Sequence, residues 1–306
     1  MIAAGPHDAA FGAPRAGGRR GLSHYHRRML APSRHWSDLA TTDFAALDLE
    51  RAVAVLPVAA TEQHGPHLPL SVDSDLASGI VAASLPHLPA DLPALFLPVQ
   101  AVGFSPEHAG FAGTLTLRAE TVIRLWTELA ECVAATGVRK LLIFNTHGGQ
   151  VGLLDVVARD LRARLGMMVV STSWFSLPLH EADGADVNAR FDAGEHRFGI
   201  HGGDIETSMM LALSPARVRL DAARRFDSTA RERAASCAIL GNGRSARFAW
   251  QTQDLNPAGA VGDAAAASAD KGQALVAAAG RALAALLVEI DRLPPDTLRA
   301  PRAGGA

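Results

Sequence analysis

The sequence predicts an α/β fold in which helices cover both faces of a mostly parallel sheet. Short apolar runs alternate along the chain with longer segments whose apolar residues recur at helical spacing, and this order is typical of β-α-β units. The first run, over residues 52–60, is apolar at nearly every position, as expected for a strand buried on both faces. We therefore expect a three-layer α/β/α sandwich with its site at the carboxyl ends of the strands.

The expected elements follow one another from residue 52 onward. We expect strands over residues 52–60, 92–103, 140–145 and 167–174. We expect helices over residues 74–85, 119–137 and 151–165, a further helix from about residue 204, and a long Ala-rich helix within residues 264–290. Pro86 and Pro89 end the first helix, because proline cannot donate the backbone hydrogen bond, and Gly137 ends the second.

The composition is that of an ordinary globular protein. The 306 residues are 48% hydrophobic and 20% charged, with a formal net charge of −2, and a chain of this length can bury a sizeable core. Outside the N-terminal tail, no Lys/Arg-rich run is interleaved with aromatic residues, so nucleic acid is not an expected partner. The two cysteines, Cys132 and Cys237, provide neither a disulfide framework nor a thiolate metal site, and we expect a cytoplasmic protein.

We divide the chain into one domain and two tails. Residues 1–35 are rich in Ala, Gly, Pro, Arg and His without hydrophobic periodicity, which predicts a disordered extension. The extension holds a pair of arginines, but no apolar export segment follows them, and Met29 is an alternative start. Residues 36–293 are expected to form a single domain and residues 294–306 a flexible tail. No window of about 18 uninterrupted apolar residues occurs, so we expect no membrane-spanning helix.

Metal-binding side chains follow the expected strands at one edge of the sheet. Glu62, His64 and Asp73 come after the first strand, and His147 follows the third. Residues two apart in extended backbone point the same way, so Glu62 and His64 can face one cavity. Carboxylate oxygens and neutral imidazoles are the ligands of zinc and of manganese-like ions.

A third segment adds three more side chains of the same kind at the start of an apolar helical pattern: His201, Asp204 and Glu206. When one carboxylate bridges two ions about 3.5 to 4 Å apart, the pair activates water for hydrolysis at neutral pH. The three segments together therefore indicate a two-metal hydrolase site.

Several of these residues also have a structural interpretation. Asp73 can act as the N-cap of the following helix, and His147 can be a hydrogen-bonded turn residue. Asp75 is best explained as a negative charge at a helix N-terminus. Three residues stay open between a substrate-binding loop and a structural role: His67, Glu107 and His108.

Five motifs in a consistent order, spread over about residues 36–292, carry a resemblance to a known family. They are LPVAATEQHGPHLPLSVD, FAGTLTL, NTHGGQ, HGGDIETSMMLALSP and GDAAAASADKG. Together they resemble the creatininase family of creatinine amidohydrolase-like metal hydrolases. The resemblance implies a three-layer α/β/α fold, two divalent metal ions per chain (zinc, or zinc with manganese or iron), and a homo-oligomer that is commonly a hexamer.

The resemblance also implies roles for individual residues. Glu62, Asp73 and His147 would hold one ion, and His64, Asp73 and Glu206 would hold the other. His201 matches the catalytic histidine that handles substrate and shuttles a proton. The residues assigned to the substrate pocket are Trp174, which matches a pocket tryptophan, together with Gly148, Gly149, Glu107 and His108.

The sequence departs from the founding creatininase pattern in two places. Gly148 and Gly149 stand where that enzyme has a Tyr-Glu pair, and no tryptophan occurs around Arg197 and Phe198, where its lid supplies one. Both changes alter the pocket that would recognise creatinine. The polar, loop-like residues 177–199 are our candidate for the lid that selects substrate.

The resemblance implies hydrolysis of a non-peptide C–N bond in a small amide, either a creatinine-like lactam or a formamide. Other family members remove a formyl group from a pyrimidine intermediate or trim a short-peptide precursor of a redox cofactor, and these activities remain alternatives. An alternative of another class is a non-catalytic α/β protein that binds a small ligand. The presence of all five expected ligands argues against it, because a pure binder need not keep them.

Overall fold

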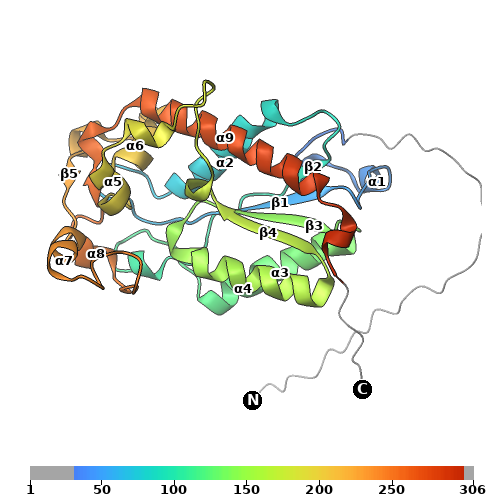
Figure 1. Cartoon of the computed structure of the whole chain (residues 1–306), viewed down its shortest axis with the longest axis horizontal. Helices are drawn as coiled ribbons and strands as arrows, with labels where there is room; N and C mark the ends of the chain where they lie inside the picture. The colour runs from blue at the N-terminus through green and yellow to red at the C-terminus, as the bar shows by residue number, and fades with distance from the viewer. Residues whose placement is uncertain (1–30, 300–306) are drawn as a thin grey trace, which may run out of the picture.

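Four parallel strands form the centre of the structure, a computed structural model that describes residues 31–299. Their spatial order is β2 (Ala94–Phe96), β1 (Val53–Val58), β3 (Lys140–Asn145) and β4 (Met168–Ser173) (Figure 1). The third strand has the expected bounds, whereas the second is much shorter than residues 92–103. Pro93 and Pro98 flank it, and proline has no N–H to donate to a ladder.

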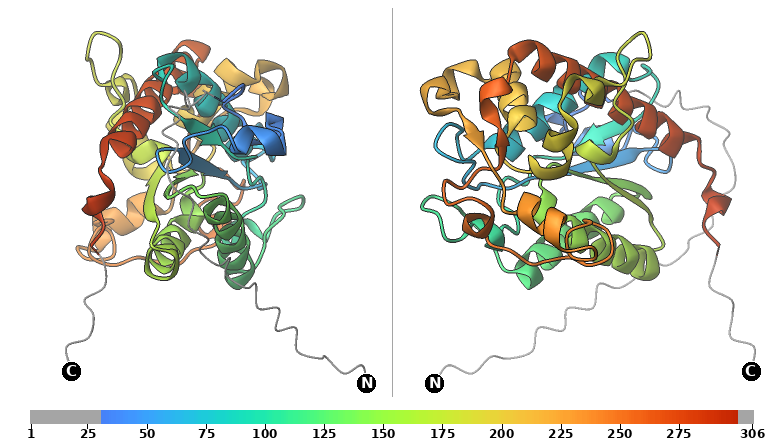
Figure 2. Two further views of the ribbon diagram at one scale, coloured as in Figure 1. Left: turned by 90° about the vertical axis from the view of Figure 1, so that its right-hand side faces the viewer. Right: turned by 60° about the vertical axis from the view of Figure 1, so that its left-hand side comes forward.

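Helices cover both faces of this sheet, as expected for a three-layer sandwich (Figures 1 and 2). One face carries α2 (Val72–Ser84), α6 (Asp204–Leu213) and α9 (Ala269–Arg292), and the other carries α3 (Ala119–Ala135) and α4 (Val151–Leu165). Successive side chains of β1 alternate between the two apolar clusters, because neighbouring residues in a strand point to opposite faces.

Short elements gather at the end of the molecule beyond the carboxyl ends of the strands, on the left of Figure 1. They are α5 (Ala193–Phe198), α7 (Ala230–Ser236), α8 (Thr252–Leu255) and the antiparallel pair β5 (Arg225–Phe226) and β6 (Gly262–Asp263). The remaining short helix, α1 (Thr41–Phe44), lies at the opposite end.

The expected tails lie mostly outside the described residues, which exclude 1–30 and 300–306. At the end of the expected N-terminal extension, the guanidinium of Arg34 donates to the carbonyls of Pro89 and Leu92, at 2.6 and 2.5 Å. His35 pairs with Phe96 of β2 as an isolated parallel bridge. Residues 34 and 35 therefore contact the sheet edge.

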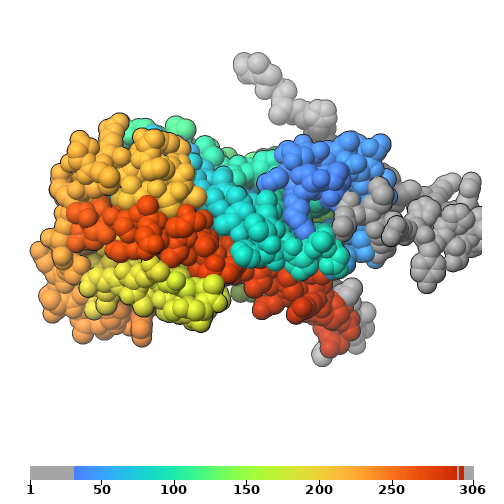
Figure 3. Space-filling view, turned by 90° about the horizontal axis from the view of Figure 1, so that it is seen from above, coloured from blue at the N-terminus to red at the C-terminus, as the bar shows by residue number. Residues whose placement is uncertain are grey.

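Helix α9 is the one described helix that is long and apolar enough to cross a membrane by length and composition, with a mean hydropathy of 1.6 over its best window. Half of that window is buried inside the structure, where α9 contacts α2 and α6. Figure 3 shows α9 lying between these helices and the yellow-green segment before α5. Its apolar character is thus explained by packing on the sheet.

Residues 177–199 are packed more firmly than the loop that we expected. Leu179, Val187 and Phe191 are buried, and the segment contains a 3-10 helix, Val187–Arg190, in addition to α5. Arg190 forms an ion pair with Asp270 of α9 at 2.7 Å. Apolar side chains spaced among the polar residues therefore fix this segment to the helical layer.

Candidate metal centre

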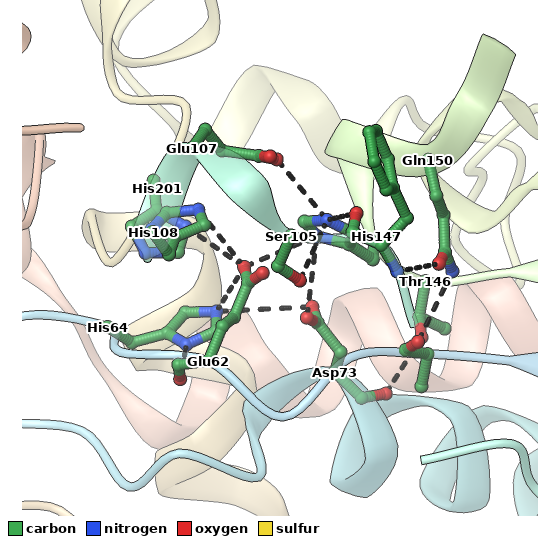
Figure 4. Close-up of polar contacts among 12 residues, drawn as sticks. Glu62, His64, Asp73, Ser105, Glu107, His108, Thr146, His147, Gln150 and His201 are labelled. Carbon is green, nitrogen blue, oxygen red and sulfur yellow. Dashed lines mark hydrogen bonds and ion pairs between the residues drawn. The ribbon is translucent and has the colours of Figure 1, made fainter. Parts of the chain in front are cut away.

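Five carboxylate and imidazole side chains meet beyond the carboxyl ends of β1 and β3. Figure 4 shows Glu62, Asp73 and His147 there, with His64 beside them. The two strands are neighbours in the sheet, with Val58 opposite Asn145, so the segments that follow them leave the sheet side by side. The first segment carries Glu62 and His64, and the second carries His147. Helices α2 and α6 add one carboxylate each: Asp73 and Glu206.

The five side chains form two groups that share Asp73. Glu62, Asp73 and His147 offer ligand atoms within 4.8 Å of one another, and so do His64, Asp73 and Glu206. Asp73 turns a different oxygen to each group: Oδ2 lies 3.6 Å from Nδ1 of His147, and Oδ1 lies 3.9 Å from Nε2 of His64. This is the geometry of a carboxylate placed to bridge two cations.

Backbone carbonyls orient two of the histidines. Nδ1 of His64 lies 3.0 Å from the carbonyl oxygen of Glu62, and Nε2 of His147 lies 3.1 Å from that of Phe104. In each case, a neutral ring that donates to the carbonyl from one nitrogen directs the lone pair of its other nitrogen toward the carboxylates. Metal-binding histidines are held in the same way by an outer hydrogen bond.

Several buried polar atoms of the cluster have no hydrogen-bond partner among residues 31–299. They are both carboxylate oxygens of Glu62, Oδ2 of Asp73 and Nε2 of His64. All three side chains are at most 2% exposed. Buried polar groups are normally paired, since an unpaired one loses its hydration without compensation. Divalent cations would satisfy all of these atoms, so the residues present fit a pair of metal ions.

Burial and neighbouring charges shift the protonation of the cluster. Burial and the adjacent Glu62 raise the pKa of Asp73 well above its ordinary value, and burial raises that of Glu206. Burial lowers the pKa of His64 to about 3. Burial works to lower the pKa of His147, but the carboxylates of Glu62, Glu107 and Asp73 together outweigh it, so this pKa is raised. The metal-free cluster therefore holds protons that a cation would displace.

Two further histidines, His108 and His201, lie beside Glu62 with their rings tilted against each other and the ring centroids 4.1 Å apart. Nε2 of His201 lies 2.6 Å from the carbonyl oxygen of Gln63, which leaves Nδ1 facing Oε1 of Glu62 at 3.8 Å. The side chain of Gln63 donates to Nδ1 of His108 at 2.8 Å, so His108 presents its Nε2–H to Glu62 at 3.3 Å. His108 therefore points this N–H toward Glu62, and together with Glu62 and Glu107 it forms a further group whose ligand atoms lie within 4.8 Å of one another.

Sequence reasoning missed a set of supporting residues around the cluster. The hydroxyl of Thr146 donates to the carbonyl of Asp73 at 2.8 Å, and the amide of Asn145 donates to the carbonyl of His147 at 2.6 Å. The amide of Gln63 also donates to the carbonyl of Gly259, at 2.7 Å. Each of these polar residues lies within two positions of an expected ligand in the sequence, which is the signal that could have identified them.

The expected substrate residues are only partly brought to the cluster. Glu107 reaches it, with Oε1 3.3 Å from Nε2 of His147. Gly148 and Gly149 are exposed in the 3-10 helix Gly148–Gln150 that follows His147. Trp174 is instead 5% exposed within the apolar cluster beneath α9, and none of the contacts described for residues 31–299 joins it to the carboxylates. Its position after the edge strand β4 directs it into the helical layer.

Three other polar residues that the sequence singled out have structural partners. Nε2 of His67 contacts the hydroxyl of Thr207 at 2.9 Å, in a buried position. Asp75 pairs with Arg217 at 2.8 Å in the first turn of α2, which agrees with the expected role at a helix N-terminus. Asp204 forms an ion pair with Lys271 at 2.6 Å. The expected N-cap role of Asp73 is not seen, because Asp73 makes no side-chain capping hydrogen bond at the start of α2.

Comparisons with known proteins agree with this arrangement. The family model for creatinine amidohydrolase (creatininase) matches residues 37–287. The mycofactocin precursor peptide peptidase of Mycobacterium tuberculosis strain H37Rv is 32% identical over 262 residues, which cover 84% of this chain and 91% of the relative. The creatinine amidohydrolase of Pseudomonas putida is 31% identical over 182 residues, which cover 55% and 67% of the two chains.

Solved structures show the same fold. A crystal structure of creatinine amidohydrolase (creatininase) has a TM-score of 0.67 at 23% identity and covers 86% of this chain and 100% of its own. A manganese creatininase also has a TM-score of 0.67, at 24% identity, and covers 85% of this chain and 100% of its own. At this level of identity the likeness supports the fold and carries no statement about substrate.

Proposed function

The chain belongs to the creatininase family, and from this premise we propose that it is a two-metal amidohydrolase that cleaves a peptide bond in a short peptide. The observation that carries the proposal is the pair of ligand groups sharing Asp73. Support for a peptide substrate comes from the Mycobacterium tuberculosis relative named as a precursor peptide peptidase, which matches over 84% of this chain, against 55% for the creatinine amidohydrolase.

The surface after His147 supports a substrate longer than creatinine. Gly148 and Gly149 are exposed, and a Cβ at Gly148 would meet no heavy atom within 4 Å. Our expectation of a non-peptide bond in a lactam or formamide therefore has less support than the peptide-trimming alternative. An extended peptide needs open surface on both sides of the bond that is cleaved, whereas a small ring is better held by an enclosed pocket.

We propose the same metal ligands that the sequence indicates. Glu62, Asp73 and His147 would hold one ion, and the second group would hold the other through the shared Asp73. Three carboxylates with two imidazoles suit zinc or manganese. When bound, such a pair of ions polarises the scissile carbonyl and activates water.

We propose that His201 carries the proton that the leaving amine needs. Its Nε2–H donates to the carbonyl of Gln63 at 2.6 Å, so its Nδ1 is the atom that can take up a proton and later give it up. This Nδ1 faces Glu62 across 3.8 Å, at the edge of the proposed metal pair. Gln63 holds the ring in this orientation and also fixes the neighbouring His108.

The test is an activity screen of the purified protein loaded with zinc or manganese. Short peptides, creatinine and N-formyl compounds are compared at equal concentration, with a chelated sample as control. We expect cleavage of a peptide at a rate well above that for creatinine, lost with the chelator and restored by metal. Faster hydrolysis of creatinine than of every peptide would overturn the proposed substrate class, and activity unaffected by chelation would overturn the metal mechanism.

A further inference from the structure

An open groove of about 890 Å³ is lined by residues of the short elements beyond the carboxyl ends of the strands. Figure 1 shows α5 and α7, which help to form it, at that end of the molecule. The walls of the groove come from the end of α5, from α7 and from the loop of residues 240–250. We call it the arginine groove, after its four lining arginines: Arg197, Arg233, Arg244 and Arg247. None of these arginines belongs to the metal centre, and the comparisons assign no role to the groove.

The positive charge of this groove is not neutralised. No Asp or Glu is among the described residues that line it, and none of its four arginines takes part in an ion pair within residues 31–299. Arg197 donates to the carbonyl of Gly241 at 3.2 Å, and Arg233 donates to the hydroxyl of Thr229 at 3.0 Å. Both acceptors are neutral, so the charge remains available to a ligand. In a chain with a net charge of −2, such a concentration of positive charge is local.

Apolar side chains are exposed among the arginines. Ile200, Leu240 and Phe248 are 50, 53 and 51% exposed, and all three line the groove. The guanidinium of Arg233 lies 5.1 Å from the ring centroid of Phe248. Exposed apolar groups side by side with guanidinium groups that have no carboxylate partner are typical of a surface that binds another molecule.

The groove is joined to the metal centre through two of its walls. Ile200 directly precedes His201 in the chain. Trp250 stands two residues before Thr252, whose hydroxyl donates to the carbonyl of Glu107 at 2.9 Å and contacts Nδ1 of His108 at 2.8 Å. A molecule held in the groove therefore lies against segments that continue into the site.

We propose that the arginine groove binds an acidic, partly apolar segment of the peptide substrate, remote from the bond that is cleaved. Guanidinium groups pair with carboxylates through two parallel hydrogen bonds, and the exposed apolar residues accommodate intervening side chains. The volume exceeds what a single small anion would fill. The catalytic consequence rests on the proposed peptidase function, whereas binding in the groove does not.

Binding is measured first, by fluorescence anisotropy with the metal-loaded protein. The probes are a labelled peptide of glutamate and leucine and the same peptide with glutamine for glutamate. We expect the glutamate peptide to bind at least about tenfold more tightly, and the advantage to fall with added salt. The double variant Arg244→Gln/Arg247→Gln should lose about tenfold in affinity for it. Both side chains are exposed, so the variant should fold.

The matched control is Arg118→Gln/Arg159→Gln, which removes the same charge from exposed sites near α3 and on α4 and should bind the glutamate peptide normally. Equal affinity for the two peptides, or an unchanged affinity in the groove variant, would overturn the proposal. Competition by phosphate at equal concentration would show a small-anion site instead. A smaller particle mass for the groove variant by light scattering would show that the groove is a subunit interface.

Kinetics separate this inference from the proposed function. For an acidic peptide that the enzyme cleaves, the groove variant should raise KM about tenfold and keep kcat, while cleavage of a neutral peptide stays unchanged. If peptides are cleaved but the groove variant keeps its KM, the groove inference fails and the function stands. If no peptide is cleaved, the proposed function fails. The anisotropy measurement then shows by itself whether the groove binds acidic peptides.

Discussion

The carboxylate of Glu107 occupies the space into which a side chain at position 149 would extend. A Cβ built on Gly149 would lie 1.6 Å from Oε1 of Glu107 and 2.6 Å from Nε2 of His147. These two atoms are themselves 3.3 Å apart. The loop after β2 therefore delivers a carboxylate to the metal centre through a gap that exists because residue 149 is glycine.

Gly149→Ala should reduce activity about a hundredfold without unfolding the protein. The new methyl group displaces Glu107 and presses on His147, and a displacement of about 1 Å in an active site can have an effect of this size. The measurement is kcat/KM with the metal content determined in parallel. Gly148→Ala is the matched control, because a Cβ there would meet no heavy atom within 4 Å. Equal activity of the two variants would contradict the tight fit at position 149.

Asp73→Ala should remove nearly all bound metal, because Asp73 belongs to both ligand groups. Elemental analysis of the purified variant gives the number of ions per chain. Asp75→Ala is a suitable control, since Asp75 lies in the same helical turn but pairs with Arg217 and should leave the metal content unchanged. Two metals per chain in Asp73→Ala would rule out the bridging assignment.

The fold was predictable where the apolar pattern is regular. Helix α4 has the expected bounds, because helical periodicity ends at Gly166, which adopts a left-handed conformation with φ of 65°. The second strand was overestimated, since its apolar residues are interrupted by prolines that a hydrophobicity pattern does not weigh. Residues 177–199 were predicted as a loop because their buried apolar residues lack a helical or strand period.

The candidate site was predictable where residues directly follow strands. Glu62 and His147 could be brought together because β1 and β3 are parallel neighbours. Glu107 was assigned to the substrate pocket by resemblance, because the path that brings its 3-10 helix, Pro106–His108, to the metal centre depends on tertiary contacts. Trp174 was assigned to the pocket by resemblance alone, but it packs under α9. The arginine groove was not predictable, because its arginines are scattered singly along the chain.

Metal affinity should increase as the pH rises. The pKa values of Asp73, Glu206 and His147 are raised in the metal-free protein, so these groups hold protons that a cation must displace. At lower pH more protons compete, and at higher pH fewer do. Calorimetric titration with zinc in buffers of different ionisation enthalpy should show net proton release. A heat of binding that is independent of the buffer would mean that no protons leave, contrary to this expectation.

Glu195→Gln should weaken both the fold and the metal centre, because Glu195 is a buried anchor for the segment that leads into Glu206. Its carboxylate accepts the backbone N–H of Asp204 at 2.7 Å and that of Asp263 at 2.9 Å, which ties the start of α6 to β6. A glutamine has one oxygen and turns an N–H toward the second donor, so the free energy of unfolding should fall by about 1–3 kcal/mol.

Urea unfolding measures this loss of stability, and elemental analysis should show that the Glu195→Gln variant loses metal, because Glu206 lies in the first turn of α6. The control is Glu181→Gln, which removes the ion pair between Glu181 and Arg190 in the same part of the chain. Both partners there are about one-third exposed, so its effect on stability should stay below about 1 kcal/mol. If the two variants were equally stable and equally loaded with metal, the hydrogen bonds of Glu195 would not be what holds α6 in position.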